Sequence, residues 1–255
     1  MNSDYLTLKN DLSDIGIQSG DSILLHSSYK SMGGLEGGIK TFVEALLSVL
    51  GDKGTLIAPT LTYRDVSVDN PVFDYLNTPS CVGAISEYIR TMDGAKRSIH
   101  PTHSCSAIGG KMDYFIHGHE LDRTPVGENS PIYKLRCEGG KVLMLGCGVE
   151  CNTSMHGVEE CFGTSYVLPK NPSPYTMIMP DKTYTIDFYR HHIRQNGYAQ
   201  RYGRLRDVMG KEYFVRGVIH GAESYLIDSK EMWRVGLDCL SKDEFFFVEK
   251  EKTQN

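Results

Sequence analysis

Apolar residues in the first part of the chain form two short runs and, between them, one helical pattern. Residues 22–26 (SILLH) predict a strand, and residues 54–58 (GTLIA) predict a second strand that Pro59 ends. Residues 38–50 place six apolar side chains at the spacing of one helix face, and Gly51 follows as the expected C′ residue. This order of strand, loop, helix and strand predicts a βαβ unit and therefore a parallel sheet.

The same periodicities predict further elements up to about residue 165. One helix face carries Val82, Ile85, Ile89 and Met92, with Ser80 as its expected N-cap. The other elements predicted in this part are strands at 104–109 and 141–146 and helices at 130–137 and 152–162.

The pattern changes after residue 165. Residues 175–189 read as two strands around a Pro-Asp-Lys turn, and residues 228–241 read as a C-terminal helix. We therefore predict an α/β fold with a mostly parallel central sheet flanked by helices and an antiparallel β elaboration in the C-terminal third. The predicted organisation is one domain over 1–255, with a core at about 10–165 and the elaboration at about 166–250.

The composition excludes several classes of protein. The 255 residues are 40% hydrophobic and 23% charged, which is typical of a globular protein and not of a disordered, collagenous or coiled-coil one. The formal net charge of −5 argues against a sequence-independent nucleic-acid binder and fits a cationic small molecule better. We expect no membrane span, because no long apolar run occurs, and no signal peptide, because residues 1–14 are too polar.

The seven cysteines do not form a recognisable framework. Their number is odd and no C-x-x-C occurs, so we expect free thiols and a reducing cytoplasm. Cys147, Cys151 and His156 form C-x3-C-x4-H, which could suggest zinc, but a fourth ligand at matching spacing is missing. We therefore predict no metal.

A polar, glycine-rich segment lies between the first predicted strand and the first predicted helix. In HSSYKSMGGLEGG (26–38), free backbone N–H groups at the helix start attract anions, and glycines let a phosphate or a pantetheine chain come close. Donors and one positive charge are added by Ser27, Ser28, Lys30 and Ser31. The alternative is an ordinary glycine-rich loop, since neither a dinucleotide fingerprint nor a Walker motif is present.

A second polar segment, RSIHPTHS, spans 97–104. Arg97 and Ser98 have the chemistry to hold a phosphate, and His100 and His103 lie close together around a rigid proline. The alternative is that these histidines are structural.

The third segment, NTSMHGVEE, opens the predicted helix that Asn152 or Thr153 caps. Thr153, His156 and Glu160 share one helix face, and Glu159 lies three residues after His156. The helix N-terminus favours the neutral imidazole and a nearby carboxylate favours the cation, so His156 is a candidate general base. The alternative is a solvated helix face with a capping threonine.

A competing motif lies near the C-terminal third. Arg194, Gly197 and Ala199 match R-x-x-G-x-A, the pyrophosphate loop of the GCN-related acetyltransferase fold. That loop should follow a buried strand and open an amphipathic helix, whereas here FYRHHI precedes the match and the very polar QRYGRLRD follows it.

Taken together in their order along the chain, several segments resemble the aminoglycoside 3-N-acetyltransferases, a fold distinct from the GCN-related enzymes. The resemblance covers roughly 10–165 and 215–241. The matching segments are LLHSSYKSMGGLEGG, GTLIAPT, TPSCVGAISEYIR, RSIHPTHSCSAIG, GHELDRTPVGENSPIYKL, GGKVLMLGCGVECNTSMH and GAESYLIDSKEMW.

The resemblance implies an acyltransferase that uses acetyl-CoA and acts on a small-molecule amine, with a homodimer as a possible assembly. His156 looks like the family's catalytic histidine, with His103 nearby; Glu160, or else Glu159, would orient His156, and Thr153 or backbone N–H groups would stabilise the oxyanion. The residues expected to bind the cofactor are Ser27, Ser28, Lys30, Ser31, Gly33, Arg97 and Ser98.

The acceptor is less well defined by the resemblance. Some antibiotic-modifying members carry an acidic residue where this chain has Thr102 and His103, and other members acetylate other amines. We expect Asp65, Asp122 and Glu223 to contact a cationic acceptor of the aminoglycoside or amino-sugar kind.

Two alternative functions remain open at this point. One is a Cys-dependent ping-pong acyltransferase or hydrolase that pairs Cys151 or Cys147 with His156. The other is a non-catalytic protein that binds CoA or a nucleotide.

Overall fold

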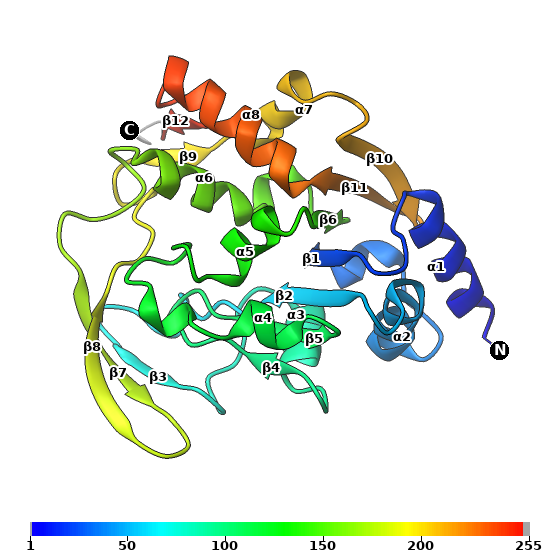
Figure 1. The fold of residues 1–255 in the computed structure, drawn as a ribbon, viewed down its shortest axis with the longest axis horizontal. Helices are drawn as coiled ribbons and strands as arrows, with labels where there is room; N and C mark the ends of the chain where they lie inside the picture. The colour runs from blue at the N-terminus through cyan, green and yellow to red at the C-terminus, as the bar shows by residue number, and fades with distance from the viewer. Residues whose placement is uncertain (1, 252–255) are drawn as a thin grey trace.

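A twisted seven-stranded sheet forms the centre of the molecule (Figure 1). The computed structural model describes residues 2–251. From one edge to the other, the strands are β10 (Phe214–Ile219), β11 (Ala222–Asp228), β6 (Lys141–Leu145), β1 (Ser22–Ser27), β2 (Thr55–Pro59), β5 (Cys105–Gly109) and β4 (Lys96–Arg97).

The strand directions confirm the predicted α/β class. β6, β1 and β2 are parallel neighbours, and the hairpins at both edges are antiparallel. Five of the seven strands still point the same way, because β10 and β4 each follow two reversals. The parallel part is thus the three-stranded centre, whose carboxyl ends meet at one edge of the sheet.

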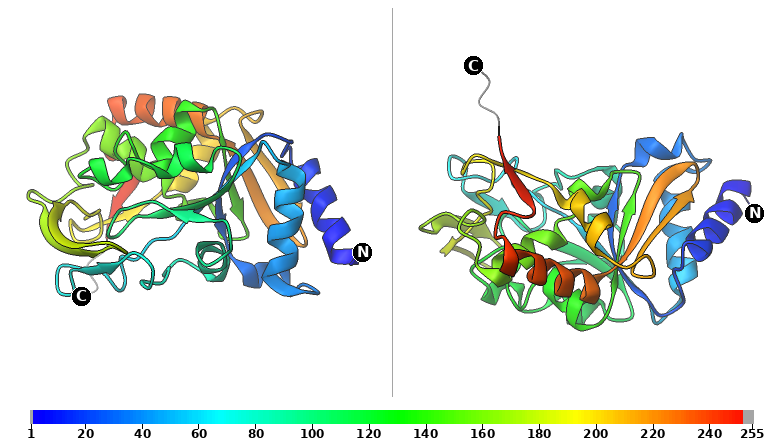
Figure 2. Two further views of the ribbon diagram at one scale, coloured as in Figure 1. Left: turned by 60° about the horizontal axis from the view of Figure 1, so that its bottom comes forward. Right: turned by 90° about the horizontal axis from the view of Figure 1, so that it is seen from above.

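Helices cover both faces of this sheet because its central strands are apolar on both sides. Ile23 and Leu25 of β1 pack on one face, and Leu24 packs on the other. The first face is covered by α1 (Ser3–Asp14), α2 (Gly38–Leu50) and α3 (Ala84–Arg90), and the second by α4 (Met112–Ile116), α5 (Pro131–Cys137), α6 (Ser154–Phe162), α7 (Leu205–Val208) and α8 (Ser229–Lys242). Figure 2 shows α1 and α8 on opposite sides.

The predicted antiparallel elaboration is present as two small sheets. The hairpin of β7 (Ser173–Ile178) and β8 (Thr183–Phe188) is joined by β3 (Val72–Asp74). A second pair consists of β9 (Tyr198–Gln200) and β12 (Val248–Lys250). Short 3₁₀ helices complete the chain: η1 (Tyr29–Met32), η2 (His119–Leu121), η3 (Val149–Cys151) and η4 (Tyr202–Arg204).

Several boundaries differ from those we predicted. α3 begins after Gly83, so Ser80 does not cap it; the amide N–H of Ser80 instead donates to Glu87. The central sheet also contains β10 and β11, which come from the part after residue 165 that we assigned to the elaboration, and α8 packs on the same face. The organisation as one domain stays a prediction.

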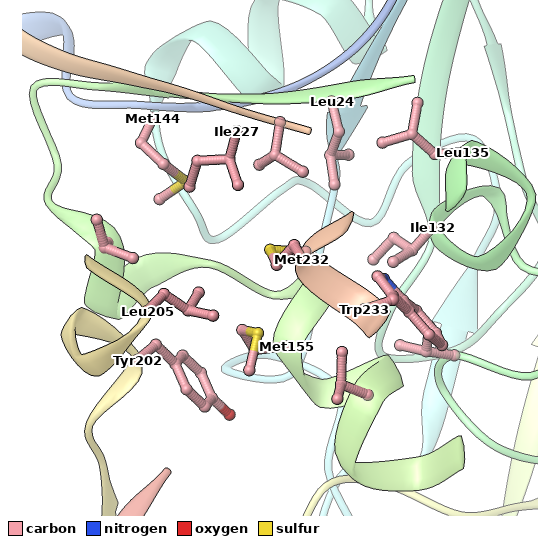
Figure 3. Packing of buried hydrophobic residues seen from close by; sticks show 14 of the residues in the cluster. Leu24, Ile132, Leu135, Met144, Met155, Tyr202, Leu205, Ile227, Met232 and Trp233 are labelled. Atoms are coloured by element: carbon pink, nitrogen blue, oxygen red, sulfur yellow. The ribbon is translucent and has the colours of Figure 1, made fainter. Parts of the chain in front are cut away.

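The core beneath α6 fixes the position of this helix (Figure 3). Trp233 of α8 is fully buried, and its indole N–H donates to Ser154 Oγ at 3.0 Å. A Cβ atom added at Gly157 would lie 2.5 Å from the Trp233 ring, so α6 and α8 approach as closely as a glycine allows. The first turns of α6 are therefore held against a rigid aromatic side chain.

Candidate active site

A cavity of about 700 Å³ opens where the three parallel strands end. His26 and Ser27 enter it from β1, Pro59 from the end of β2 and Cys147 from the loop after β6. The carboxyl edge of parallel strands is the usual place for ligands in such sheets. The remaining wall comes from α3, the start of α6, η3, the loops after β2 and between β4 and β5, and the connection from β8 to β9.

The start of α6 brings Thr153 and His156 into this cavity. Asn152 precedes the helix, and its side-chain oxygen accepts a hydrogen bond from the N–H of Ser154 at 3.0 Å. The predicted cap is thus Asn152, whereas Thr153 makes no capping hydrogen bond and leaves its hydroxyl free for other contacts.

His156 is fixed through its Nδ1 atom. Tyr202 Oη lies 2.7 Å from Nδ1, and Glu159 Oε2 lies 3.3 Å from it. The Tyr202 hydroxyl donates to Glu159 at 2.8 Å, so its oxygen is free to accept the N–H of His156. Tyr166 donates to the other carboxylate oxygen of Glu159 at 3.0 Å. Two hydroxyl donors and one imidazole N–H therefore surround a carboxylate with no solvent exposure.

This arrangement makes Nε2 the available atom of His156. With the proton on Nδ1, Nε2 carries a lone pair, and it has no hydrogen-bond partner among residues 2–251. Burial raises the pKa of both tyrosines, so Tyr202 and Tyr166 stay protonated donors. A histidine held in this way has the geometry of a general base.

Glu159, and not Glu160, is the carboxylate bonded to His156. Glu160 stays on the same face of α6 but bonds to another partner: its Oε1 lies 2.5 Å from His191 Nε2, and both of its oxygens accept the N–H of Val126. We expected Glu160, or else Glu159, to orient His156, and the structure shows the contact with Glu159, because spacing on a helix face does not tell which way a side chain turns.

His103 lies in the cavity wall but has no free ring nitrogen. Its Nε2 is 3.0 Å from His191 Nδ1, and its Nδ1 is 2.8 Å from Thr102 Oγ1. The His191 and His156 rings are 4.3 Å apart, so a chain from Glu160 through His191 to His103 runs beside the base. Burial, followed by neighbouring histidines, holds the pKa of His103 well below its usual value.

His26 is the fourth histidine in the cavity. Its Nε2 lies 3.3 Å from Thr153 Oγ1, and burial lowers its pKa to about 3. His26 is thus neutral at ordinary pH and positions the Thr153 hydroxyl at the edge of the cavity.

Of the residues predicted to bind the cofactor, the structure places one in the cavity wall. Ser27 lines it, while Ser28, Lys30, Ser31 and Gly33 follow directly on the loop that leads to the surface. Gly33 has φ 73° and ends η1, which makes this loop a compact turn beside the cavity.

Arg97 and Ser98 do not fit the predicted role. Arg97 is buried, and its guanidinium donates to Ser104 and to the backbone carbonyls of Tyr75, Thr78 and Thr60. Ser98 is fully buried between His119 and the N–H of Cys105. Both side chains stabilise the loops beneath the cavity instead of holding a phosphate.

The three acidic residues predicted to contact an acceptor also lie outside the cavity lining. Asp122 is buried, and its carboxylate accepts from the backbone and side chain of Asn129. Glu223 on β11 pairs with Arg216 on β10, and Asp65 is exposed on the loop after β2. The charged side chains that do line the cavity are Arg64, Glu150, Arg190 and Arg194, which we did not predict.

Three further residues near His156 become apparent only in the folded structure. Tyr166, His191 and Tyr202 lie 10, 35 and 46 residues after His156, outside the three segments that we singled out for catalysis and cofactor binding. The pattern at Arg194, Gly197 and Ala199 leads into the short strand β9 and opens no helix, so it is not a pyrophosphate loop.

Two of the cysteines that we considered as nucleophiles or metal ligands lie at the cavity. Cys147 and Cys151 both line the cavity, and a hydrogen bond with Cys147 lowers the pKa of the Cys151 thiol to about 7. Among residues 2–251, no group of three or more histidine, cysteine or acidic side chains is arranged to hold a metal ion. None of the helices described is both long and apolar enough to cross a bilayer.

Comparison with known proteins assigns this cavity to a class. The family profile described as aminoglycoside 3-N-acetyltransferase matches residues 24–241. Aminoglycoside N(3)-acetyltransferase III from Salmonella sp. is 28% identical over 268 residues, covering 91% of this chain and 89% of the relative. Aminoglycoside N(3)-acetyltransferase IX from Micromonospora chalcea is 30% identical over 60% of both chains.

Solved structures agree with this result. A histidine-to-alanine mutant of aminoglycoside acetyltransferase AAC(3)-IVa in complex with gentamicin superposes with a TM-score of 0.81 at 26% identity, over 95% of this chain and 90% of that one. AAC-IIIb with CoASH superposes with a TM-score of 0.77 at 26% identity, over 93% and 96%. The fold is that of the aminoglycoside 3-N-acetyltransferases, and the enzyme is an acyltransferase. The chain belongs to the aminoglycoside 3-N-acetyltransferase family.

The buried histidines predict a loss of stability in acid. Burial is the main cause that depresses the folded-state pKa of His26, His100, His103, His119 and His191. The unfolded chain binds these protons near pH 6.5 and the folded chain does not, so each group costs about 1.4 kcal/mol per pH unit below that value. Glu160 acts in the opposite sense, because burial raises its pKa to about 7, but it is one group against five.

Denaturant unfolding between pH 7 and pH 5 measures this effect. His119→Gln removes a histidine whose pKa burial lowers to about 4, and it should flatten the decline of the unfolding free energy by about 1.4 kcal/mol per pH unit. His117→Gln, at an exposed position, is the matched control and should keep the wild-type slope. Equal slopes in wild type and His119→Gln would show that His119 is not held neutral.

Proposed function

We propose that this enzyme transfers an acetyl group from acetyl-CoA to an amine of an aminoglycoside or a related amino-sugar-like substrate by direct attack. The observation that carries the proposal is the bare Nε2 of His156, which faces the cavity while Tyr202 and Glu159 hold Nδ1. The bound ligands named for two related structures, CoASH and gentamicin, support the two substrates.

His156 acts at the step in which the amine attacks the thioester. Its Nε2 takes a proton from the amine as the new C–N bond forms, and the imidazolium that results is stabilised by Glu159. The proton then passes to the sulfur of CoA as the C–S bond breaks. The buried carboxylate thus compensates a positive charge that exists only during the reaction.

The oxyanion of the tetrahedral intermediate needs a donor close to the base. The Thr153 hydroxyl lines the cavity three residues before His156, and His26 holds it at 3.3 Å. When Thr153 donates to the oxyanion, its own oxygen accepts from His26 Nε2–H, so the donor is oriented beforehand. Cysteine chemistry is not needed in this scheme.

The cofactor extends from the cavity along the loop after β1. Ser27 lines the cavity, and Ser28, Lys30, Ser31 and Gly33 continue to the surface, where Lys30 is exposed. The Ser31 hydroxyl and the N–H groups of Ser28, Ser31 and Gly33 already donate within the protein, so the ammonium group of Lys30 and the hydroxyls of Ser27 and Ser28 are the groups that suit the phosphates of CoA.

The role of His156 is tested by steady-state kinetics. His156→Ala should lower kcat by about 10²–10⁴-fold, with little change in the affinity for acetyl-CoA, because general-base help has this size. The rise of kcat/KM with pH that a histidine base produces should be absent from this variant.

Two matched glutamate variants test how His156 is positioned. Glu159→Gln should lower kcat by about tenfold or more, since the imidazolium loses its counter-charge. Glu160→Gln, one residue along the same helix and bonded to His191, should have the smaller effect. A larger loss in Glu160→Gln would assign the orienting role to the chain through His191 and His103.

A cysteine-dependent route is the second candidate, because Cys151 lines the cavity and has a lowered pKa of about 7. If transfer is direct, Cys151→Ala should retain turnover within about tenfold, and acetyl-CoA alone should leave no thioester on the protein by mass spectrometry. A stable acetyl adduct together with a loss of several orders of magnitude would establish the ping-pong route.

A further inference from the structure

The charged side chains around the cavity are mostly positive. Arg64, Arg190 and Arg194 line it, and Glu150 is the one acidic residue in the lining of the described cavity. The chain as a whole has a net charge of −5, so this group of arginines opposes the overall sign. A ligand entering the cavity therefore meets a local positive field.

The carboxylates near the cavity all accept hydrogen bonds from the protein. Glu150 accepts the backbone N–H groups of Tyr202 and Gly203 at 2.8 and 3.0 Å. Glu159 is surrounded by its three donors, and Glu160 is bonded to His191 and Val126. Glu159 and Glu160 are thus committed to buried contacts, and Glu150 is the one carboxylate of the lining that keeps lone pairs for an ammonium group of a ligand.

The arginines, in contrast, keep donors available. Within residues 2–251, Arg190 makes no hydrogen bond or ion pair, and Arg64 donates one hydrogen bond, to the carbonyl of Cys81. Arg194 is 79% exposed and has one acidic neighbour, Glu251, at 3.6 Å. Guanidinium groups bind carboxylates and phosphates through two parallel hydrogen bonds, which suits them to an anionic ligand.

Arg190 lines the same cavity as His156, and its charge helps to lower the pKa of the neighbouring His103 and His191. Arg190 directly precedes His191, whose ring centroid is 4.3 Å from that of His156. An anion bound by Arg190 would thus belong to a molecule whose amine is within reach of His156. The loop proposed for the cofactor phosphates is a separate segment that begins at Ser27 and carries its own cation, Lys30.

From this charge distribution we propose that the acceptor is an amine that also carries a carboxylate or phosphate group, which Arg190 and Arg194 bind, with Arg64 in the same cavity lining. The proposal rests on the proposed function, because it specifies the substrate class of the same site. A polyamine with several ammonium groups is disfavoured by the same field.

The test compares two amines that differ in one phosphate. Thiol release from acetyl-CoA is measured with glucosamine and with glucosamine 6-phosphate, and with gentamicin as the polycationic probe. We expect kcat/KM for glucosamine 6-phosphate to exceed that for glucosamine by about tenfold or more, and the preference to shrink at high salt.

Variants assign the preference to the arginines. In Arg190→Gln/Arg194→Gln, the ratio of the two kcat/KM values should fall to about one, while KM for acetyl-CoA stays unchanged. Arg216→Gln, which removes an equal charge at an exposed site paired with Glu223, is the matched control and should keep the wild-type ratio. Arg190→Lys/Arg194→Lys should retain part of the preference, and thermal unfolding confirms that each variant is folded.

Three outcomes overturn the proposal. A wild-type ratio of one or less, or faster acetylation of gentamicin than of the phosphorylated sugar, contradicts an anionic acceptor. A higher KM for acetyl-CoA in the double variant, with the ratio intact, assigns the arginines to the cofactor phosphates instead.

Calorimetry with the CoA-saturated protein separates this proposal from the proposed function. If no amine is acetylated but glucosamine 6-phosphate still binds more tightly than glucosamine, the anion site stands and the acetyltransferase function fails. If both sugars are acetylated with equal kcat/KM and bind equally, the function stands and the anion site fails.

Discussion

The active site depends on one buried negative charge. Glu159 has no solvent exposure, and an ionised carboxylate in such a place is stable only when donors surround it. Its donors come from three separate parts of the chain: His156 from its own helix, Tyr166 from the segment after α6, and Tyr202 from η4. Satisfying this carboxylate therefore fixes the imidazole, closes the cavity wall and joins the C-terminal third to the central sheet.

Most of the central fold follows from local patterns in the sequence. The helix at 38–50 was predicted with its observed bounds, and the strands at 22–26, 104–109 and 141–146 agree to within one residue, because each is strongly apolar and ends at a glycine or a polar residue. α1 was not predicted, because its sequence is polar apart from a few contacts such as Leu8 and Leu12. The hairpin of β10 and β11 was missed because its strands gain their burial from sheet neighbours distant in sequence.

The sequence located His156 and Thr153 but did not reveal the residues that contact them. His156 and Thr153 lie where the motif placed them, since helix spacing is a local property. We favoured Glu160 as the carboxylate beside His156, whereas Glu159 is the one in contact with it. The acidic residues expected around the acceptor make other contacts; Asp122, for example, accepts hydrogen bonds from Asn129. Side-chain direction and long-range pairing decide these roles, and a single sequence contains neither.

The proposed mechanism requires that His156 carries its proton on Nδ1 and presents a bare Nε2 to the cavity. Nitrogen-15 NMR of protein labelled in its histidine rings measures this tautomer directly, with the His156→Ala variant identifying the signal. The account predicts that neutral His156 is the Nδ1–H tautomer, because Tyr202 and Glu159 accept that proton. A neutral His156 protonated on Nε2 would contradict it, since the base would then face the amine with a proton instead of a lone pair.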